Sequence, residues 1–487
     1  MPLQITGVGS NLDANSIISQ LMQLEQRPLI VLNQREASYQ AKLSAFGTIK
    51  GALSALQSAA RAISAAAAFS VRKATVADST IFTATASTTA ASGSYDVEVR
   101  NLAQAQKLRT IGVSATSALG SGALTLAFGT YRTVDADNVV FDANASKPSR
   151  TITVAAGTDK LSDIRDAINN AGAGVTASIV GDGASAHLFV ASNDTGLANQ
   201  LRITVDDNDG NDTDASGLSI LAYDAVKTAG VSGAKNLTEF ASAEDSRVVI
   251  NGIAITSASN AITKAIDGAT LTLLKESDAG VTTKLTVAND NAAVKSAIDA
   301  FVKAYNDANK TLRDATKFDA AAKKGSTLTG DSTVLAVQSR LRDVLSAAVE
   351  GAAGFTRLSD IGIAFQLDGS LATDSAKLQT ALSDPNKSVA SLFIANGASQ
   401  GIAARIDAVT SGMLSSTGLL AGRTDGIDSS IKDIGKRREA IERRLEAVEK
   451  RYRAQFTALD TLISSMTNTA SFLQQQLSSL PTFTQGQ

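Results

Sequence analysis

The sequence predicts an α+β multidomain protein in which long terminal α-helices form a coiled-coil stalk, joined to a mixed helical domain and nested β-rich insert domains. Three observations lead to this fold class. A heptad register runs from Ile427 to Leu480, a matching helical period occurs near the N-terminus, and the Thr-, Ser-, Val- and Gly-rich middle alternates with period two. With 487 residues the chain is long enough for several domains.

The C-terminal register places apolar side chains at twelve of its sixteen core positions. A stripe that keeps a spacing of about 3.5 residues needs a partner helix along its length. At about 1.5 Å per residue the segment could span roughly 80 Å, which is too long for a core helix of a compact domain. We therefore expect this segment to mediate assembly with other protein chains.

The other face of this segment is charged. Between Lys432 and Arg453 there are nine Lys or Arg against five Asp or Glu. The signs are mixed and aromatic residues are not interleaved with them. This pattern favours a solvated coiled-coil flank over a stripe that binds nucleic acid.

The N-terminus shows a similar amphipathic pattern. Asn11 or Asp13 could cap a helix, and Pro28 should kink or divide it because proline lacks an amide donor. Since neither terminal helix has an obvious local partner, we expect the two to pack on each other as a stalk. Residues 70–290 would then be inserted between the two strands of chain that form this stalk. The N-terminal stripe consists of Ile17, Leu21, Leu24 and Leu29.

The change of composition along the chain predicts four nested domains. The expected division is 1–40 and 425–487 as the terminal coiled-coil stalk, 41–75 and 290–424 as a mixed mainly helical domain, 76–115 and 240–289 as a β-rich domain, and 116–239 as an inserted distal β-rich domain.

Local signals place several elements within these domains. Asn251-Gly252 between two apolar runs predicts a β-hairpin with a type I′ turn, because both of its central residues need positive φ. Asp331 should cap a helix that ends near Leu345. The other expected elements are strands at 95–99, 124–128, 151–154, 175–180, 187–190, 201–205, 271–274 and 284–287, short helices at 161–169 and 374–382, and a small hairpin at 365–371.

The composition excludes several classes of protein. The formal net charge of −2 gives no reason to expect binding to nucleic acid or to a membrane surface, and no apolar run is long enough to span a bilayer. The absence of Cys removes disulfides, thiolate metal sites and Cys nucleophiles. No basic region followed by an apolar run marks a signal peptide, so we expect any export to use another route.

Candidate chemistry is sparse. No metalloprotease, phosphate-loop, dinucleotide or nucleophile-elbow motif is present. The single histidine, His187, lies in a predicted strand, where a structural role is favoured over catalysis. We therefore predict no catalytic residues, no cofactor site and no metal site.

One acidic cluster, at 206–214, leaves an alternative open. Its end, Asp212-x-Asp214-x-Ser216-Gly217, matches the opening of an EF-hand calcium loop, but the twelfth position is Tyr223 instead of Glu. A solvated loop is the favoured interpretation, and a weak calcium site is the alternative.

Several segments resemble the flagellar hook-associated protein 2 family, the filament-capping proteins of bacterial flagella. The similarity is carried by ITGVGSNLD at 5–13, IISQLMQLEQRPL at 17–29, LTGDS at 328–332, LSDIGI at 358–363 and the tail at 443–480. The block at 161–190 resembles a motif shared by flagellins and hook-associated proteins. The resemblance is specific at both ends and loose between about 115 and 240.

The resemblance implies a non-enzymatic assembly protein at the distal tip of the flagellum, outside the cell. It would retain exported flagellin, promote its folding and polymerisation, and so be required for motility. The implied partners are further copies of itself in a ring, for which we take a pentamer as working hypothesis, flagellin, hook–filament junction proteins, and an export chaperone at the C-terminal helix. Nucleic acid and membrane are not among them.

We expect the two terminal stripes to dock into the ring or the filament. The candidate residues are Ile17, Leu21, Leu24, Leu29, Leu445, Tyr452, Leu459, Met466, Leu473 and Leu480. Packing within a single chain is the alternative role for each. The alternative function is a tip adhesin, in which the insert at 116–239 binds a host glycan or another surface ligand. A flagellin-type filament subunit and an enzyme carried on an export stalk are weaker alternatives.

Overall fold

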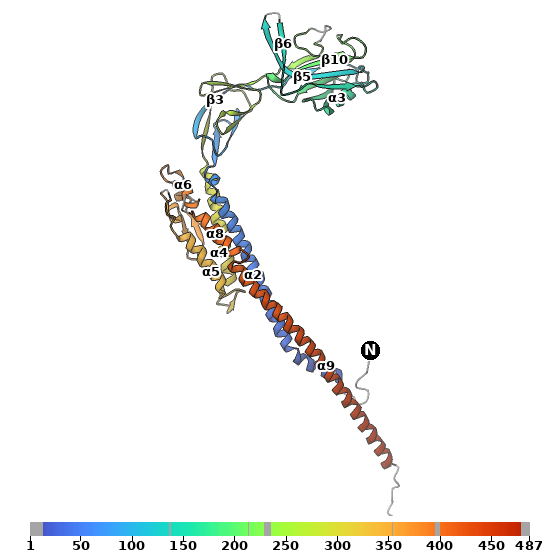
Figure 1. Ribbon diagram of the computed structural model, residues 1–487, viewed down its shortest axis with the longest axis vertical. Helices are drawn as coiled ribbons and strands as arrows, with labels where there is room; N and C mark the ends of the chain where they lie inside the picture. Colours follow the sequence, from blue (N-terminus) through green and yellow to red (C-terminus); the bar gives the residue numbers. More distant parts are fainter. Residues whose placement is uncertain are drawn as a thin grey trace, which may run out of the picture. The chain divides into compact units, whose positions relative to one another are not determined.

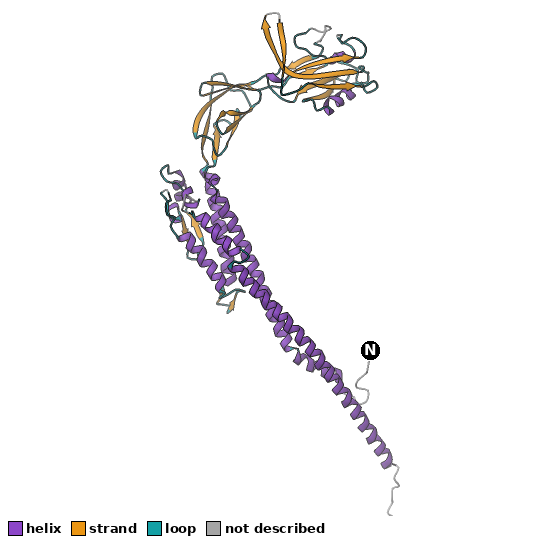
Figure 2. Ribbon diagram, viewed as in Figure 1, coloured by secondary structure: helices purple, strands orange, loops and turns teal. Residues whose placement is uncertain are grey.

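The computed structural model describes residues 13–135, 138–212, 214–227, 235–352, 354–394 and 400–478. The chain divides into two compact units, which we call the helical unit (Met1–Phe69 with Asn291–Gln487) and the β unit (Ser70–Asp290). Figure 2 shows helices dominating the first and strands the second. This combination confirms the predicted α+β class. The finer division into four domains stays a prediction.

The helical unit is built from long helices with a few short strands. Its described elements are α1 (Ala14–Glu25), α2 (Arg27–Ser64), the 3-10 helix η1 (Ala66–Phe69), α4 (Asn291–Thr316), β17 (Phe318–Asp319), β18 (Lys324–Gly325), α5 (Ser332–Ser346), η4 (Leu358–Ile361), β19 (Ile363–Phe365), β20 (Leu371–Thr373), α6 (Ser375–Ser383), α7 (Ala390–Phe393), α8 (Ile402–Leu414) and α9 (Leu419–Ser478).

The core of the helical unit lies where α4, α8 and the start of α9 pack along α2 (Figure 1). Helix α4 turns one apolar face toward this core, with Ile298, Phe301 and Tyr305 buried at spacings of three and four. Leu420 and Ile427 anchor the first turns of α9 in the same cluster. This core therefore fixes where the long C-terminal helix begins.

Asp331 caps α5 as the sequence predicts and also ties it to α9. Its carboxylate accepts the Thr333 amide at 3.0 Å and the Arg423 guanidinium at 2.8 Å. We expect Asp331→Ala to destabilise the helical unit by roughly 1–3 kcal/mol, through the lost cap and the unpaired arginine. Asp331→Asn keeps a capping oxygen and should lose only part of this. Urea unfolding followed by far-ultraviolet circular dichroism measures both, and equal stability of all three proteins would contradict the prediction.

Strands are the main regular elements of the β unit. Its described elements are β1 (Arg72–Val76), β2 (Phe82–Ala86), β3 (Gly93–Asn101), β4 (Lys107–Arg109), β5 (Gly122–Asp135), β6 (Asn138–Ala143), β7 (Arg150–Val154), α3 (Leu161–Asn170), β8 (Val175–Gly181), β9 (Ala186–Ser192), η2 (Leu197–Asn199), β10 (Gln200–Asp207), η3 (Gly217–Leu221), β11 (Thr238–Ala241), β12 (Ser246–Ile250), β13 (Ile253–Ser257), β14 (Ala261–Ile266), β15 (Ala269–Leu273) and β16 (Thr283–Asn289).

Two apolar clusters organise the β unit. A five-stranded sheet, β1-β16-β3-β12-β13, and a three-stranded sheet, β14-β15-β2, share one cluster. Two four-stranded sheets and α3 surround the other; β5 pairs with β10, β6 and β7 in one sheet, and the second has the order β11-β4-β9-β8. The predicted hairpin joins β12 to β13, with φ of 49° at Asn251 and 87° at Gly252.

Candidate docking surface on the terminal helices

The two ends of the chain pack as antiparallel helices. Three side-chain contacts give the register. Arg453 donates to Asn15 at 3.3 Å, Arg438 to Glu36 at 2.6 Å, and Lys50 to Thr424 at 3.3 Å. Later positions in α1 and α2 thus contact earlier positions in α9, so the helices run antiparallel. The expected packing of the two terminal helices on each other is present within one chain.

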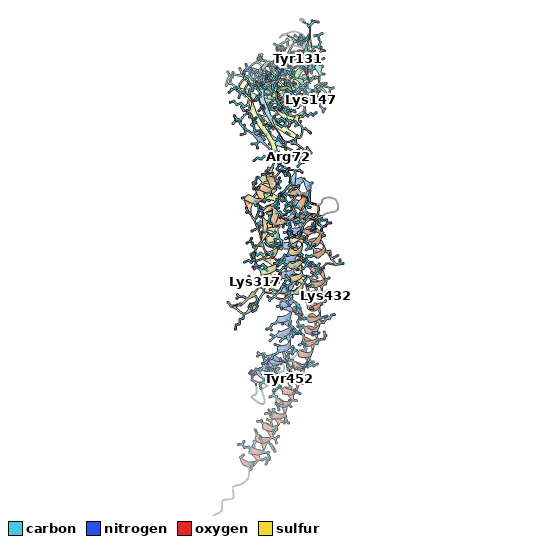
Figure 3. The ribbon with its side chains drawn as sticks, turned by 90° about the vertical axis from the view of Figure 1, so that its left-hand side faces the viewer. Arg72, Tyr131, Lys147, Lys317, Lys432 and Tyr452 are labelled. Atoms are coloured by element: carbon cyan, nitrogen blue, oxygen red, sulfur yellow. The ribbon has the colours of Figure 1, made fainter. Side chains whose placement is uncertain are left out.

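An apolar seam holds the outer part of this pair. Ile18 and Met22 of α1 pack against Leu445 and Val448 of α9, and all four are buried. The half-buried residues at the edge of this seam are Leu29, Ile441, Tyr452 and Phe456. Figure 3 labels Lys432 and Tyr452 on this paired part of α9. The heptad register therefore has a partner from Ile427 as far as Phe456.

The N-terminal helix is divided where proline requires it. Asp13 accepts the Ser16 amide at 3.0 Å and so caps α1, while Asn11, the other candidate cap, lies outside the described residues. Helix α1 ends at Glu25 and α2 starts at Arg27, with Pro28 in its first turn, where no amide donor is needed. Gln26, between the two helices, keeps a helical backbone conformation, with φ of −78° and ψ of −10°.

Beyond Phe456, α9 continues to Ser478, and no further residue of the apolar seam lies along this part among the described residues. At about 1.5 Å per residue this outer part extends roughly 33 Å. With about 100° between successive residues, five large apolar side chains fall within roughly 60° of one another. They are Leu459, Leu462, Met466, Leu473 and Leu477, with exposed fractions from 41% to 68%. We call them the outer stripe.

The predicted docking residues fall into three groups. Leu445 is buried in the seam, and Tyr452 and Leu29 flank it. Ile17 and Leu21 are half-buried, and Leu24 is exposed, because α1 turns its neighbouring residues Ile18 and Met22 toward α9. Leu459, Met466 and Leu473 belong to the outer stripe, and Leu480 lies outside the described residues.

The sequence reasoning missed Ile18, Met22, Phe456 and Leu477. In α1, Ile17-Ile18 and Leu21-Met22 are adjacent apolar pairs. The face with Ile17 and Leu21 and the face with Ile18 and Met22 therefore both show helical spacing, and the sequence does not tell which one is buried. Leu477 was missed because an ideal α-helix drifts about 20° per heptad, which brings position 477 into line with Leu459. A helical wheel drawn at 3.6 residues per turn would have included it.

The described residues of the β unit supply no competing chemical site. Within those residues, no three His, Asp or Glu side chains converge as metal ligands. Asp207 is buried and accepts the Ser219 amide at 3.0 Å, and Asp212 accepts the Asp207 amide at 2.6 Å. The acidic cluster thus orders its own loop. His187 contacts the Thr110 carbonyl oxygen through Nδ1 at 2.9 Å, in line with the predicted structural role.

Comparison with known proteins identifies the family. The family description "Flagellar hook-associated protein 2 N-terminus" matches residues 10–106, "Flagellar hook-associated protein 2 C-terminus" matches 243–468, and "Flagellin hook IN motif" matches 138–206. Flagellar hook-associated protein 2 of Escherichia coli K12 is 34% identical over 482 residues, covering 96% of this chain and 97% of that protein. The chain belongs to the flagellar hook-associated protein 2 family.

Two further relatives agree with this assignment. Flagellar hook-associated protein 2 of Salmonella typhimurium is 33% identical and covers 97% of this chain and 98% of its own length. The crystal structure of the flagellar cap protein FliD D1-D2-D3 domains from Escherichia coli is similar with a TM-score of 0.62 and 33% identity, over 79% of this chain and 99% of that one. The predicted membership of the hook-associated protein 2 family is confirmed.

The relatives also bear on activity. They are structural proteins of the flagellum and not enzymes, which confirms the prediction that this member of the hook-associated protein 2 family is not an enzyme. Among the residues that the structure describes, no helix combines the length and the apolar character needed to cross a membrane.

Proposed function

We propose that this chain is the filament cap at the distal tip of a bacterial flagellum, outside the cell. Several copies form a ring, for which a pentamer is the working hypothesis, and the ring retains exported flagellin and promotes its folding and polymerisation. Membership of the hook-associated protein 2 family and the similarity to a protein described as the flagellar cap support this function. The chain leaves the cell through the flagellar export apparatus.

One observation carries the mechanism: the outer stripe of α9 is an apolar surface that nothing in the described chain covers. Contiguous exposed apolar surface of this kind marks an interaction site, because leaving it in water is unfavourable. We propose that the outer stripe docks the cap on the helical surfaces of the filament tip or the hook–filament junction. Before export the same stripe is the binding site for a chaperone. The action of the cap is binding and confinement, without bond chemistry.

The test is complementation of a strain that lacks its own cap. Full-length protein should stop flagellin from leaking into the medium and restore filaments and motility. A chain that ends at Phe456 keeps the seam but lacks the outer stripe, and it should restore neither. Both proteins must be shown in the medium, so that failure of export is not mistaken for failure of capping. Continued leakage with exported full-length protein would overturn the proposed function, and restoration by the shortened chain would overturn the role of the stripe.

The comparisons give no support to the adhesin alternative, which stays an untested prediction for the insert at 116–239. Binding of the isolated insert to glycans or to cell surfaces would be its direct test.

A further inference from the structure

A second apolar stripe runs along the N-terminal helices beside the seam. Its members follow one another at alternating spacings of four and three residues, and we call them the second stripe: Ile17, Leu21, Leu24, Pro28 and Val31. Each directly precedes one of the buried or half-buried positions 18, 22, 25, 29 and 32. Leu24 is 54% exposed and Val31 46% exposed. Because this spacing is typical of a helix that packs on another helix, the second stripe indicates a further partner.

A row of arginines lies along α9 beside the same seam. Its members are spaced by seven residues, and we call them the arginine row: Arg437, Arg444 and Arg451. They directly precede positions 438, 445 and 452 of the heptad register. All three are exposed, and within the described part of the chain none has an ion-pair partner. The neighbouring arginines of α9 that do pair with a glutamate are Arg438, Arg443 and Arg453.

The second stripe and the arginine row lie on the same side of the helix pair. One residue corresponds to a rotation of about 100° around an α-helix. In two antiparallel helices, the positions one residue before the seam turn to the same side, because the sense of rotation reverses together with the chain direction. The contacts of Arg453 with Asn15 and of Arg438 with Glu36 place the two sets next to each other. Each set extends along its helix by about 21 Å.

The opposite side of the pair has a different character. On α1 and α2, the residues that directly follow the same five positions are polar with the exception of Ile30; they are Ser19, Gln23, Gln26, Ile30 and Asn33. On α9, the residues that directly follow seam positions 441, 445 and 448 are all acidic; they are Glu442, Glu446 and Glu449. An apolar stripe beside unpaired arginines is therefore a property of one side of the pair.

We propose that this side binds an amphipathic α-helix of another protein, which has an apolar stripe and a flank of Asp or Glu. Leu24 and Val31 are buried under its apolar stripe, and the arginine row pairs with its acidic flank. The outer stripe of a second copy does not fit as the occupant, because Asp460 is the single acidic residue between positions 457 and 478. The surface is distinct from the outer stripe that docks the cap in the proposed function.

Binding of a synthetic helical peptide tests this surface. The probe is a fluorescent peptide of about 20 residues, with leucine at the core positions of its heptads and glutamate on both flanks, and its counterpart has lysine in place of glutamate. The protein is the full-length chain with Leu459→Ala, Met466→Ala and Leu473→Ala, so that the outer stripe does not bind the probe.

The acidic peptide should bind at least about tenfold more tightly than the basic peptide at low salt, as expected for three exposed ion pairs. Added salt should reduce the difference, because it screens exposed charges. Fluorescence anisotropy measures both dissociation constants. Equal affinity for the two peptides, or no binding of the acidic one, would overturn the proposal.

Glutamine at all three positions of the arginine row should remove most of this preference. The matched control replaces a second row that has the same charge, spacing and exposure but lies one residue earlier, about 100° around the helix. This control row consists of Lys436, Arg443 and Lys450. Its replacement by glutamine should leave most of the preference. An equal loss with both triple variants would show an effect of overall charge and would overturn the role of the arginine row.

The apolar part of the surface is tested in the same assay. Leu24→Ser together with Val31→Ser should weaken binding of the acidic peptide at least about tenfold, because two apolar contacts are lost. Leu335→Ser changes a leucine of α5 that is 51% exposed, and it should leave the affinity unchanged. Unchanged binding by the first variant would overturn the role of the second stripe. None of these outcomes bears on capping, which the complementation experiment measures separately.

Discussion

Replacing Leu459, Met466 and Leu473 by alanine in one chain should abolish filament growth in the complementation assay while the secreted protein stays folded. The three side chains are exposed in the free chain, so their truncation should change its stability by no more than about 0.5 kcal/mol. If they are buried on docking, each large apolar side chain contributes roughly 1.5–3 kcal/mol. The summed loss then corresponds to a more than thousandfold weaker docking constant.

The chain offers a control with the same spacing on the opposite face of α9. Thr461, Asn468 and Gln475 each follow a stripe residue by two positions, which is about 200° around the helix, and all three are exposed. Alanine at these three positions should leave filament growth, flagellin leakage and motility as in the unchanged protein. If the stripe variant also restores full motility, the outer stripe is not the docking element. If both variants fail to restore filament growth, the loss comes from a change in the helix as a whole and not from removal of its apolar face.

This experiment depends on a feature that the sequence pattern alone could not supply. The heptad register continues from Ile427 to Leu480 with nothing to mark where the partner helix stops. Among the described residues the pairing ends where α1 begins, at Ala14, near Arg453, and that pairing is a long-range property of the fold. Periodicity could thus predict that a partner is needed, but not which turns of α9 have one within the chain.

Elements with a strong local signal were predicted well. The Asn251-Gly252 turn, the Asp331 cap and α3 each depend on residues that are close in sequence. The conformational preferences of such residues are largely independent of tertiary contacts. The prediction missed β6 and α8. Strand β6 is stabilised by pairing with β5, which is not visible in its own sequence. Helix α8 does carry a local signal, because Ile402, Ile406, Val409 and Met413 follow one another at spacings of four and three, and the prediction overlooked it.

The start of α9 shows the same limit. The helix begins at Leu419, eight residues before the first position of the heptad register, although Gly422 and Gly426 lower the helical propensity of this stretch. Burial of Leu420 in the core of the helical unit compensates for them. Tertiary packing thus extends the helix beyond the point where its own sequence favours it.

Phe393→Ala should strongly destabilise the helical unit, at a cost of roughly 3–5 kcal/mol. Phe393 is fully buried, with its ring stacked on Phe69 at 5.8 Å between centroids and edge-on to Phe301 at 6.0 Å. These three rings come from α7, η1 and α4, which are far apart in sequence. Alanine would leave a cavity lined by two aromatic rings, and it would loosen the segment just before the chain leaves the helical unit at Phe69.

Hydrogen exchange measured by mass spectrometry can localise this loss, which a single unfolding curve of a two-unit chain cannot. In Phe393→Ala, amides of α4 between Val294 and Leu312 should exchange much faster, while those of β3 and β12 in the β unit should not change. Phe318→Ala removes the same atoms from an exposed position in the helical unit and should leave both regions as they are. Unchanged protection of α4 would show that the three rings do not hold the core together, and equal loss in β3 would show that the two units do not unfold separately.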